Sequence, residues 1–299
     1  MSAAAAHRRV RPGELREGEP MAAYSTWRAG GPVRRMYCPD GAADLAAFLA
    51  GCPAEEPVLW CGMGSNLLVR DGGWPGTVLV TAPGLNAVAI DGERVRAEAG
   101  APCGQLGRAA ARAGRSGLAF LAGIPGTVGG ALAMNAGAWG EAVWDRLVEV
   151  ETVDRGGNLR RRPAADYTPG YRQVAGPEGE AFVAATWSLP ADDPEALRAW
   201  IRRMLDARNA TQPVGEATCG SVFRNPPGDA AGRLIEAAGL KGAREGGAYV
   251  SQLHANFIIN DGGTAADIER LMERVRERVA ASSGVRLEPE VHIVGEGAP

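Results

Sequence analysis

Residues 121–141 read LAGIPGTVGGALAMNAGAWGE, with six glycines among alanines and no charged side chain before Glu141. Because glycine lacks a Cβ and tolerates positive φ, such a segment brings backbone rather than side chains against a partner. Pro125 suits the beginning of a helix, and we predict a short helix over 127–134. Free N–H groups at the beginning of this helix would attract a phosphate or the edge of a heteroaromatic ring. The alternative is that the glycines only allow two secondary-structure elements to pack closely where they cross.

A second glycine turn, G-M-G-S-N at 62–66, lies between two predicted strands. It has the G-x-G beginning of a dinucleotide-binding fingerprint. The third glycine and the following helix are missing, which argues against a Rossmann unit. Successive N–H groups of such a turn can instead form a nest that holds a pyrophosphate, with Ser65 and Asn66 adding side-chain donors. The alternative is a plain hairpin connection.

Length and composition describe an ordinary globular protein. The 299 residues suggest two domains, with one long α/β domain as the alternative, and a net charge of -3 gives no electrostatic reason to expect nucleic acid or an anionic membrane as partner. Five cysteines without a C-x-x-C pair indicate reduced, mostly buried thiols in a cytoplasmic protein. The N-terminus lacks the apolar run of a signal peptide or anchor, so we expect residues 1–20 to be a flexible tail.

Helix-end signals divide the second half of the chain. Asp193 is suited to cap a helix that begins at Pro194, and we predict that this helix runs to about Arg208 and bridges into a second domain. The clearest helix is predicted over 264–283, where a capping box precedes an apolar stripe. A last strand is predicted over 285–294. These elements predict an α+β arrangement for the C-terminal part.

The residue pattern alone leaves the catalytic groups open. No Ser-His-Asp, metal or P-loop signature is present. Ser221 could simply be a turn hydroxyl. Arg172, in a predicted loop over 167–172, could be a solvated surface charge. Glu290 could face solvent from a strand.

Five motifs narrow the alternatives because they occur together and in order. They are G-x-G-S-N-L-L-V-x-D-x-G-x-x-G at 62–76, G-I-P-G-T-V-G-G-A-x-x-M-N-A-G-A-x-G at 123–140, Y-R at 171–172, G-S-V-F-x-N-P at 220–226 and L-E-P-E-V at 287–291. The set resembles the UDP-N-acetylenolpyruvoylglucosamine reductase family of flavoenzymes across nearly all of residues 24–295.

The resemblance implies an α+β fold with two domains. A two-lobed FAD-binding region of the vanillyl-alcohol-oxidase (PCMH) type would occupy residues 21–190, with lobes at about 21–83 and 84–190. An α+β substrate-binding domain, including the bridging helix, would occupy residues 191–299. A monomer in the cytoplasm is expected.

The implied reaction is the NADPH-dependent reduction, through FAD, of the enolpyruvyl group of UDP-N-acetylglucosamine enolpyruvate to UDP-N-acetylmuramate, in peptidoglycan precursor synthesis. Ser221 would donate the proton, with Arg172 and Glu290 beside the substrate carboxylate. The implied substrate contacts are Tyr171, Arg224, Asn225, Lys241 and His254. The implied FAD contacts are Arg28, Gly62, Met63, Gly64, Ser65, Asn66, Leu67, Gly123, Ile124, Pro125, Gly126, Thr127, Gly130, Asn135, Gly137 and Ala138.

Three positions depart from the family pattern. Val174 stands where a serine is common, His292 where an arginine is common, and Thr211 where a basic residue often precedes Gln-Pro. These departures concern substrate contacts rather than the flavin. The chain is also compact and resembles the branch of the family that lacks an extra tyrosine-bearing loop.

Two other functions stay open beside the reductase. One is an FAD-dependent oxidase of the same fold, which would often tether its flavin through a histidine or cysteine such as His7, Cys61 or Cys103. The other is a flavin-binding protein without turnover. Such a protein would need no proton donor, so the Ser221, Arg172 and Glu290 set argues against it.

Overall fold

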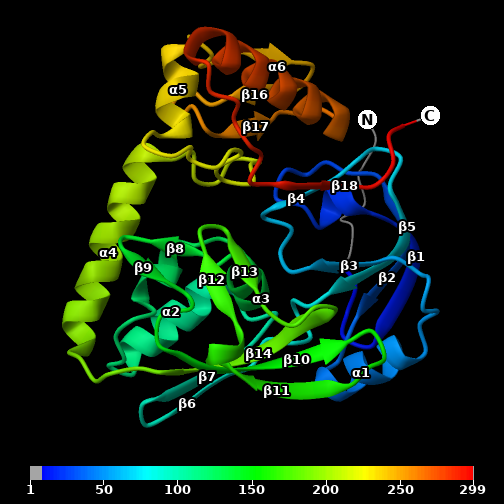
Figure 1. The fold of residues 1–299 in the computed structure, drawn as a ribbon, viewed down its shortest axis with the longest axis vertical. Helices are drawn as coiled ribbons and strands as arrows, with labels where there is room; N and C mark the ends of the chain where they lie inside the picture. The colour runs from blue at the N-terminus through cyan, green and yellow to red at the C-terminus, as the bar shows by residue number, and fades with distance from the viewer. Residues whose placement is uncertain (1–8, 299) are drawn as a thin grey trace, which may run out of the picture.

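The computed structural model describes residues 9–298, arranged as two sheet-based lobes and a C-terminal region (Figure 1). The first lobe is built on a four-stranded sheet with the strand order β1-β2-β5-β3. Its strands are β1 (Glu14–Pro20), β2 (Pro32–Cys38), β3 (Val58–Cys61) and β5 (Trp74–Val80), and helix α1 (Ala42–Ala50) follows β2. β1 is antiparallel to β2, whereas β2 and β3 are each parallel to β5.

Strand β1 corrects the prediction of a flexible tail over residues 1–20. Residues 1–8 lie outside the described part, but Glu14–Pro20 pairs with β2 along its whole length. The strand escaped detection because its inward face is ionic rather than apolar. Arg16 contacts Glu14 at 3.0 Å and Glu19 at 2.9 Å. Charged side chains are typical of an edge strand, and they give no hydrophobic alternation to recognise.

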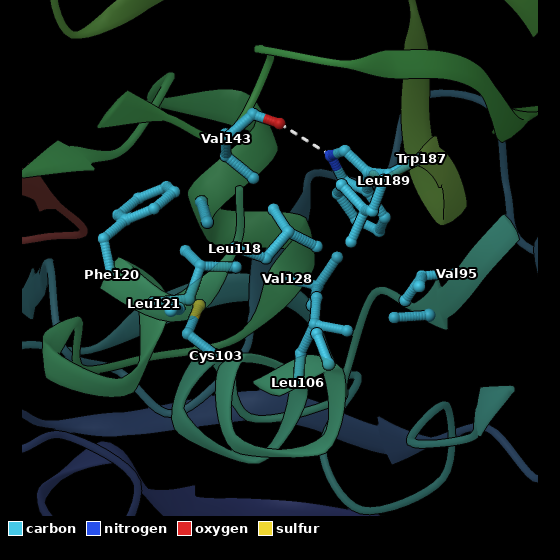
Figure 2. Close-up of a cluster of buried hydrophobic side chains, with 14 of the residues drawn as sticks. Val95, Cys103, Leu106, Leu118, Phe120, Leu121, Val128, Val143, Trp187 and Leu189 are labelled. Atoms are coloured by element: carbon cyan, nitrogen blue, oxygen red, sulfur yellow. Dashed lines mark hydrogen bonds between the residues drawn. The ribbon is translucent and has the colours of Figure 1, made fainter. Parts of the chain in front are cut away.

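The second lobe is an antiparallel five-stranded sheet with the order β11-β10-β14-β7-β6. Its strands are β6 (Val88–Asp91), β7 (Arg94–Glu98), β10 (Leu147–Asp154), β11 (Leu159–Pro163) and β14 (Glu180–Ser188). Helices α2 (Cys103–Arg112) and α3 (Val128–Ala133) pack against it, and Figure 2 shows the apolar core around Leu106, Val128 and Trp187. Trp187 donates its indole N–H to the carbonyl oxygen of Val143 at 2.7 Å, so the buried ring keeps its hydrogen bond.

Two small hairpins project from the second lobe toward the C-terminal region (Figure 1). One is formed by β8 (Gly137–Ala138) and β9 (Glu141–Ala142), and the other by β12 (Thr168–Gly170) and β13 (Gln173–Ala175). The second hairpin replaces the loop predicted over 167–172, because Pro169 and Gly170 concealed a strand of only three residues. The helix predicted over 127–134 is confirmed as α3, although it begins at Val128 rather than at Pro125.

Helix α4 (Pro194–Thr211) connects the second lobe to the C-terminal region, which we define as residues 212–298 (Figure 1). The predicted cap is confirmed, because the Asp193 carboxylate accepts hydrogen bonds from the N–H groups of Glu195 and Ala196. The C-terminal region contains a three-stranded sheet of β15 (Arg244–Glu245), β16 (Ala248–Val250) and β17 (Ile258–Asn260). Helices α5 (Ala231–Ala237) and α6 (Ala265–Ser283) pack on it, and α6 has the predicted capping box.

The chain finally returns to the first lobe. β18 (His292–Val294) pairs in parallel with β4 (Leu67–Val69), so only the last three residues of the strand predicted over 285–294 form a ladder. One apolar core joins the two parts, because Trp27 and Leu68 pack with α6. Trp27 also donates its indole N–H to the carbonyl oxygen of Ile258 at 2.8 Å. Among the described residues, no helix is long and apolar enough to cross a membrane.

Candidate active site

The two glycine segments face each other across the junction of the lobes. A Cβ on Gly62 would lie 2.3 Å from the Thr127 hydroxyl oxygen. A Cβ on Gly126 would lie 2.6 Å from the Ser65 hydroxyl oxygen, and Gly126 has a φ of 101°. Since neither position has room for a Cβ, the backbone at Gly62 and Gly126 packs directly against the Thr127 and Ser65 side chains of the opposite segment. We call the surface that the two segments form the cradle; backbone N–H groups of such glycine turns recognise the phosphate and ring edges of a dinucleotide cofactor.

The remaining predicted FAD contacts are distributed around this cradle. Gly64 is in close contact with the first lobe, because a Cβ there would lie 2.1 Å from the carbonyl oxygen of Tyr24. Leu67 is buried in the core of the first lobe, so only its backbone is left to face a ligand. Arg28 is exposed, and Gly137 and Ala138 form the short strand β8, which pairs with β9.

Three different elements bring the predicted catalytic residues together. Ser221 precedes a segment that pairs with residues 288–290, because Glu290 donates its backbone N–H to the Val222 carbonyl oxygen at 2.8 Å. Phe223 and Pro289 form the next bridge of this pair. From the turn of the β12–β13 hairpin, Arg172 places its Nε 2.8 Å from Glu290 Oε1. Residues separated by as much as 118 positions in the chain thus meet at one point.

Burial determines the charge and hydrogen-bonding state of the side chains around Arg172 and Glu290. Burial raises the pKa of the Glu290 carboxyl, and the charges of Arg172 and Arg224 only partly oppose that shift. Arg172 Nε is close enough to Glu290 for an ion pair, but its N–H is not aligned for a hydrogen bond and has no such partner among residues 9–298. Arg224 Nε is likewise buried without an acceptor in that range. The site therefore offers donors to an anionic ligand, and burial extends the protonated form of Glu290 to higher pH than in a free glutamic acid.

The turn over residues 62–66, which we call the flavin turn after its predicted role, lies directly against the Glu290 segment. The backbone N–H of His292 donates to the Asn66 carbonyl oxygen at 3.1 Å, and the Asn66 side chain donates back to the same segment. Backbone and side-chain hydrogen bonds thus connect the turn at residues 62–66 directly to the segment that carries Glu290. A ligand seated between the glycine segments would lie next to Ser221, Arg172 and Glu290.

The predicted substrate residues fall into two groups. Tyr171 and Asn225 lie next in sequence to Arg172 and Arg224 of the predicted site, and the Asn225 backbone N–H donates to the Tyr171 hydroxyl at 3.3 Å. Lys241 and His254 lie in the C-terminal region and already have partners. Lys241 pairs with Glu236 at 2.7 Å. His254 Nδ1 accepts the Asn256 N–H at 3.2 Å, and burial, followed by the Lys241 charge, lowers the pKa of His254.

Sequence reasoning missed a hollow of about 570 Å³ beside this second group. It is lined by residues that include Gln212, Tyr249, Ser251, Gln252 and Leu253, and the catalytic trio does not contribute to it. No motif marked these side chains, because they come from the end of α4 and from the sheet of the C-terminal region and meet only in the fold. Gln252 and Leu253 immediately precede His254, which was the available signal.

Comparison with known proteins decides the family. A family model described as "FAD binding domain" matches residues 33–162, and one described as "UDP-N-acetylenolpyruvoylglucosamine reductase, C-terminal domain" matches residues 212–294. UDP-N-acetylenolpyruvoylglucosamine reductase from Alkalilimnicola ehrlichii is 61% identical over 293 residues, covering 98% of both chains. The chain belongs to the UDP-N-acetylenolpyruvoylglucosamine reductase family. The protein of that name from Methylococcus capsulatus is 53% identical over 94% of this chain and 93% of its own length.

A solved member of the UDP-N-acetylenolpyruvoylglucosamine reductase family has the same fold. The structure from Thermus caldophilus matches with a TM-score of 0.81 and 34% sequence identity, covering 94% of this chain and 98% of that chain. The predicted fold class, an α+β protein with an FAD-binding region followed by a reductase C-terminal domain, is confirmed. The resemblance drawn from the five motifs is confirmed as well.

The three departures from the family pattern occupy different environments. Val174 lies on β13 opposite Pro169 and packs against the core of the second lobe. Thr211 ends α4, where its hydroxyl donates to the Ala207 carbonyl oxygen at 3.0 Å. His292 places Nε2 3.4 Å from the Met134 sulfur. Since its backbone N–H also bonds the Asn66 carbonyl oxygen, His292 contacts both glycine segments of this family member.

Proposed function

We propose that this chain reduces the enolpyruvyl group of UDP-N-acetylglucosamine enolpyruvate to UDP-N-acetylmuramate in peptidoglycan precursor synthesis, with FAD as cofactor and NADPH as reductant. Membership of the reductase family and the FAD-binding match support the reaction and the cofactor. The observation that carries the residue roles is the meeting of Arg172 and Glu290 beside the Ser221 segment, against the flavin turn.

FAD, when bound, supplies the hydride that NADPH provides and that the terminal vinyl carbon of the substrate receives. We assign the pyrophosphate of FAD to the N–H groups of residues 62–66, and its neighbouring groups to residues 123–127, because glycine leaves backbone exposed on both walls. Asn135, Gly130 and the start of β8 would border the same ligand. Arg28, which is exposed, would approach it only from the margin.

Arg172 is placed to stabilise the charge that develops on the substrate. Hydride addition to the vinyl group builds negative charge at the carbon beside the carboxylate and on the carboxylate oxygens. A guanidinium can meet two of those oxygens with paired donors, and the unaligned Nε of Arg172 leaves its donor capacity available. Glu290 in its protonated form, which burial favours, can donate to the same oxygens.

Ser221 would then deliver the proton. A hydroxyl is a poor acid in water, but an enolate-like carbon is a base strong enough to take its proton when the two groups are aligned. Positioned proton transfer of this kind contributes about 10² to 10⁴ in rate. Arg224, Tyr171 and Asn225 would hold the substrate near this point. We assign Lys241, His254 and the hollow of about 570 Å³ to the nucleotide end of the substrate.

We divide the chain into an FAD-binding domain over residues 21–190 and a substrate domain over residues 191–299. The FAD-binding match over 33–162 and the C-terminal match over 212–294 fall inside these bounds. A cytoplasmic monomer is the expected form, in keeping with the use of NADPH and a sugar nucleotide and with five free cysteines among the described residues.

The two buried thiols, Cys61 and Cys103, give little support to an oxidase that attaches its flavin covalently. Burial raises the pKa of Cys61 to about 11 and that of Cys103 to about 12, so neither is the reactive thiolate that a flavin tether requires. His7 lies outside the described residues. A flavin-binding protein without turnover would leave the clustering of Arg172, Glu290 and the Ser221 segment without a purpose.

The visible absorbance of the purified protein under anaerobic conditions tests the proposal. A flavin band should be present, should bleach with NADPH, and should return on addition of the enolpyruvyl sugar nucleotide. Return with oxygen alone at a comparable rate would favour the oxidase instead. Failure to find or bind any flavin would overturn the assignment of both glycine segments.

A further inference from the structure

Arg172 occupies a backbone conformation that a residue with a Cβ rarely adopts. It is the second residue of the two-residue turn between β12 and β13, and its φ is 56°. A turn with positive φ at this position ordinarily takes glycine, because the left-handed region is unfavourable for other side chains. A strained residue at a functional point persists only where its surroundings determine its conformation. The contacts that hold this turn therefore decide where the guanidinium lies.

Three contacts anchor the turn, and they come from two directions. Tyr171 and Arg172 contact Asn225 and Glu290 of the C-terminal region, on the side where the substrate would enter. The third contact comes from the cofactor wall, where Asn135 Nδ2 donates to the carbonyl oxygen of Gly170 at 3.0 Å. Gly170 immediately precedes the two turn residues. The Asn135 bond is thus the one of the three that ties the turn to the second glycine segment.

Asn135 is itself built for this position. Its φ is 41°, which lies in the left-handed region that asparagine tolerates better than most residues. Its donor faces Gly170, so the orientation of the amide is fixed, and its Oδ1 is buried without a hydrogen-bond partner in the part of the chain that the structure describes. The Asn135 side chain thus reaches from the glycine segment 121–141 to the β12–β13 hairpin, where its amide donates to Gly170.

We propose that Asn135 is a positioning residue for Arg172, which holds the guanidinium at the substrate carboxylate by fixing the Gly170 carbonyl. This inference rests on the proposed function, and it adds a link between the cofactor wall and the group that binds the carboxylate. This positioning role concerns the half-reaction in which the substrate is reduced. Reduction of the flavin by NADPH does not use the substrate carboxylate, whereas binding and reduction of the enolpyruvyl group do.

The test is a double-mutant cycle of Asn135→Gly with Arg172→Lys, in the flavin-loaded enzyme. Glycine keeps the left-handed backbone at 135 and removes the donor, while lysine keeps the charge at 172 and removes the paired donors. We measure the affinity of the oxidised enzyme for UDP-N-acetylmuramate by calorimetry, and each half-reaction by stopped-flow absorbance. Asn135→Gly should weaken product binding and slow flavin reoxidation by about 3- to 10-fold, as expected for the loss of one hydrogen bond. Because Asn135 is also assigned to the cofactor wall, the rate of flavin reduction by NADPH is measured in every variant, and its change is divided out of the change in the reoxidation rate.

The decisive outcome is non-additivity. If Asn135 acts through Arg172, then Asn135→Gly should have almost no further effect on product affinity in the Arg172→Lys background. Fully additive losses of product affinity would overturn the positioning role while leaving the proposed function intact. Should Asn135→Gly lose its flavin, the same cycle is run with Asn135→Asp, which keeps the side-chain shape, replaces the donor by an acceptor and adds a negative charge opposite the Gly170 carbonyl oxygen. Failure of the unmodified enzyme to be reoxidised by the enolpyruvyl sugar nucleotide would instead refute the proposed function.

Discussion

The side-chain amide of Asn66 donates a hydrogen bond to the backbone carbonyl oxygen of Glu290, 3.2 Å away. Asn66 belongs to the turn to which we assign the FAD pyrophosphate, and Glu290 is the proposed donor to the substrate carboxylate. Because a direct hydrogen bond joins them, the distance between the cofactor wall and the acidic group is fixed before any ligand binds. Such preorganisation is what hydride transfer between two bound partners requires.

Ser221→Ala should separate the two half-reactions. The variant should bind FAD and be reduced by NADPH at close to the normal rate, because the hydroxyl has no role in that step. Reoxidation by the enolpyruvyl sugar nucleotide should fall by about 10² to 10⁴, the usual contribution of positioned proton transfer. Rapid-mixing absorbance measures each step separately, and an equal loss in both would remove Ser221 from the proposed role.

Glu290 should give the oxidative half-reaction a pH dependence on its alkaline side. Burial raises the pKa of its carboxyl above the ordinary value of 4.5, so the protonated form persists to higher pH than in free glutamic acid. The rate should be highest below this raised pKa and should fall as pH rises through it. The folded state also loses the stability linked to this group over the same window.

Glu290→Gln supplies the control for that pH dependence. The amide keeps an N–H donor at every pH, so the variant should be slower than the unmodified enzyme at low pH but should lose the alkaline fall. Stopped-flow reoxidation across a pH series checks this. An unchanged alkaline limb in Glu290→Gln would assign the titration to another group.

Arg172→Gly should be more stable than Arg172→Ala, while both variants should damage the reaction. Glycine relieves the left-handed φ of 56°, so the free energy of unfolding should be about 1 kcal/mol higher than in Arg172→Ala, which keeps the strain and equally lacks the guanidinium. Both variants should bind the substrate poorly. Urea unfolding of the pair isolates the backbone contribution, and equal stabilities would show that the turn is not strained.

Gly62→Ala should weaken FAD binding without an equal loss of stability. The new Cβ would collide with the Thr127 hydroxyl oxygen at 2.3 Å and push the two walls of the cradle apart. An overpacking cost of about 1–3 kcal/mol corresponds to about a 5- to 150-fold loss of affinity. The flavin-to-protein absorbance ratio and fluorescence titration measure it. Gly51→Ala is the matched control, because its nearest non-neighbouring atom would lie 3.7 Å away and its φ is ordinary.

The sequence predicted local structure well wherever the end signals are side-chain chemistry. Asp193 and Thr264 cap the helices that they were expected to cap, because a carboxylate or hydroxyl at that position bonds N–H groups only a few residues away. The β12–β13 hairpin and strand β1 were missed for the opposite reason. Strand β1 pairs with a strand beyond its own local window, the strands of the hairpin have only three residues each, and neither segment carries apolar alternation.

The candidate site was accessible from motifs but not from residue patterns. Nothing local distinguishes Ser221 from a turn hydroxyl, or Arg172 from a surface charge, and only the resemblance of five motifs placed them in one site. Even then, the sequence could not reveal that Arg172 sits at positive φ or that Asn135 holds its turn. Both facts arise from tertiary contacts that span up to 118 residues.

The carboxylate of Asp71, two residues after β4, accepts hydrogen bonds from the N–H groups of Ala265 and Ala266 at 3.0 and 2.8 Å. Together with the pairing of β18 and β4, it closes loops of about two hundred residues between the first lobe and the C-terminal region. On the ribosome, the edge of the first lobe that carries the cofactor turn therefore stays open until synthesis is nearly finished. Cofactor capture should accordingly be a post-translational event, and nascent chains should depend on chaperones to shield that edge until then.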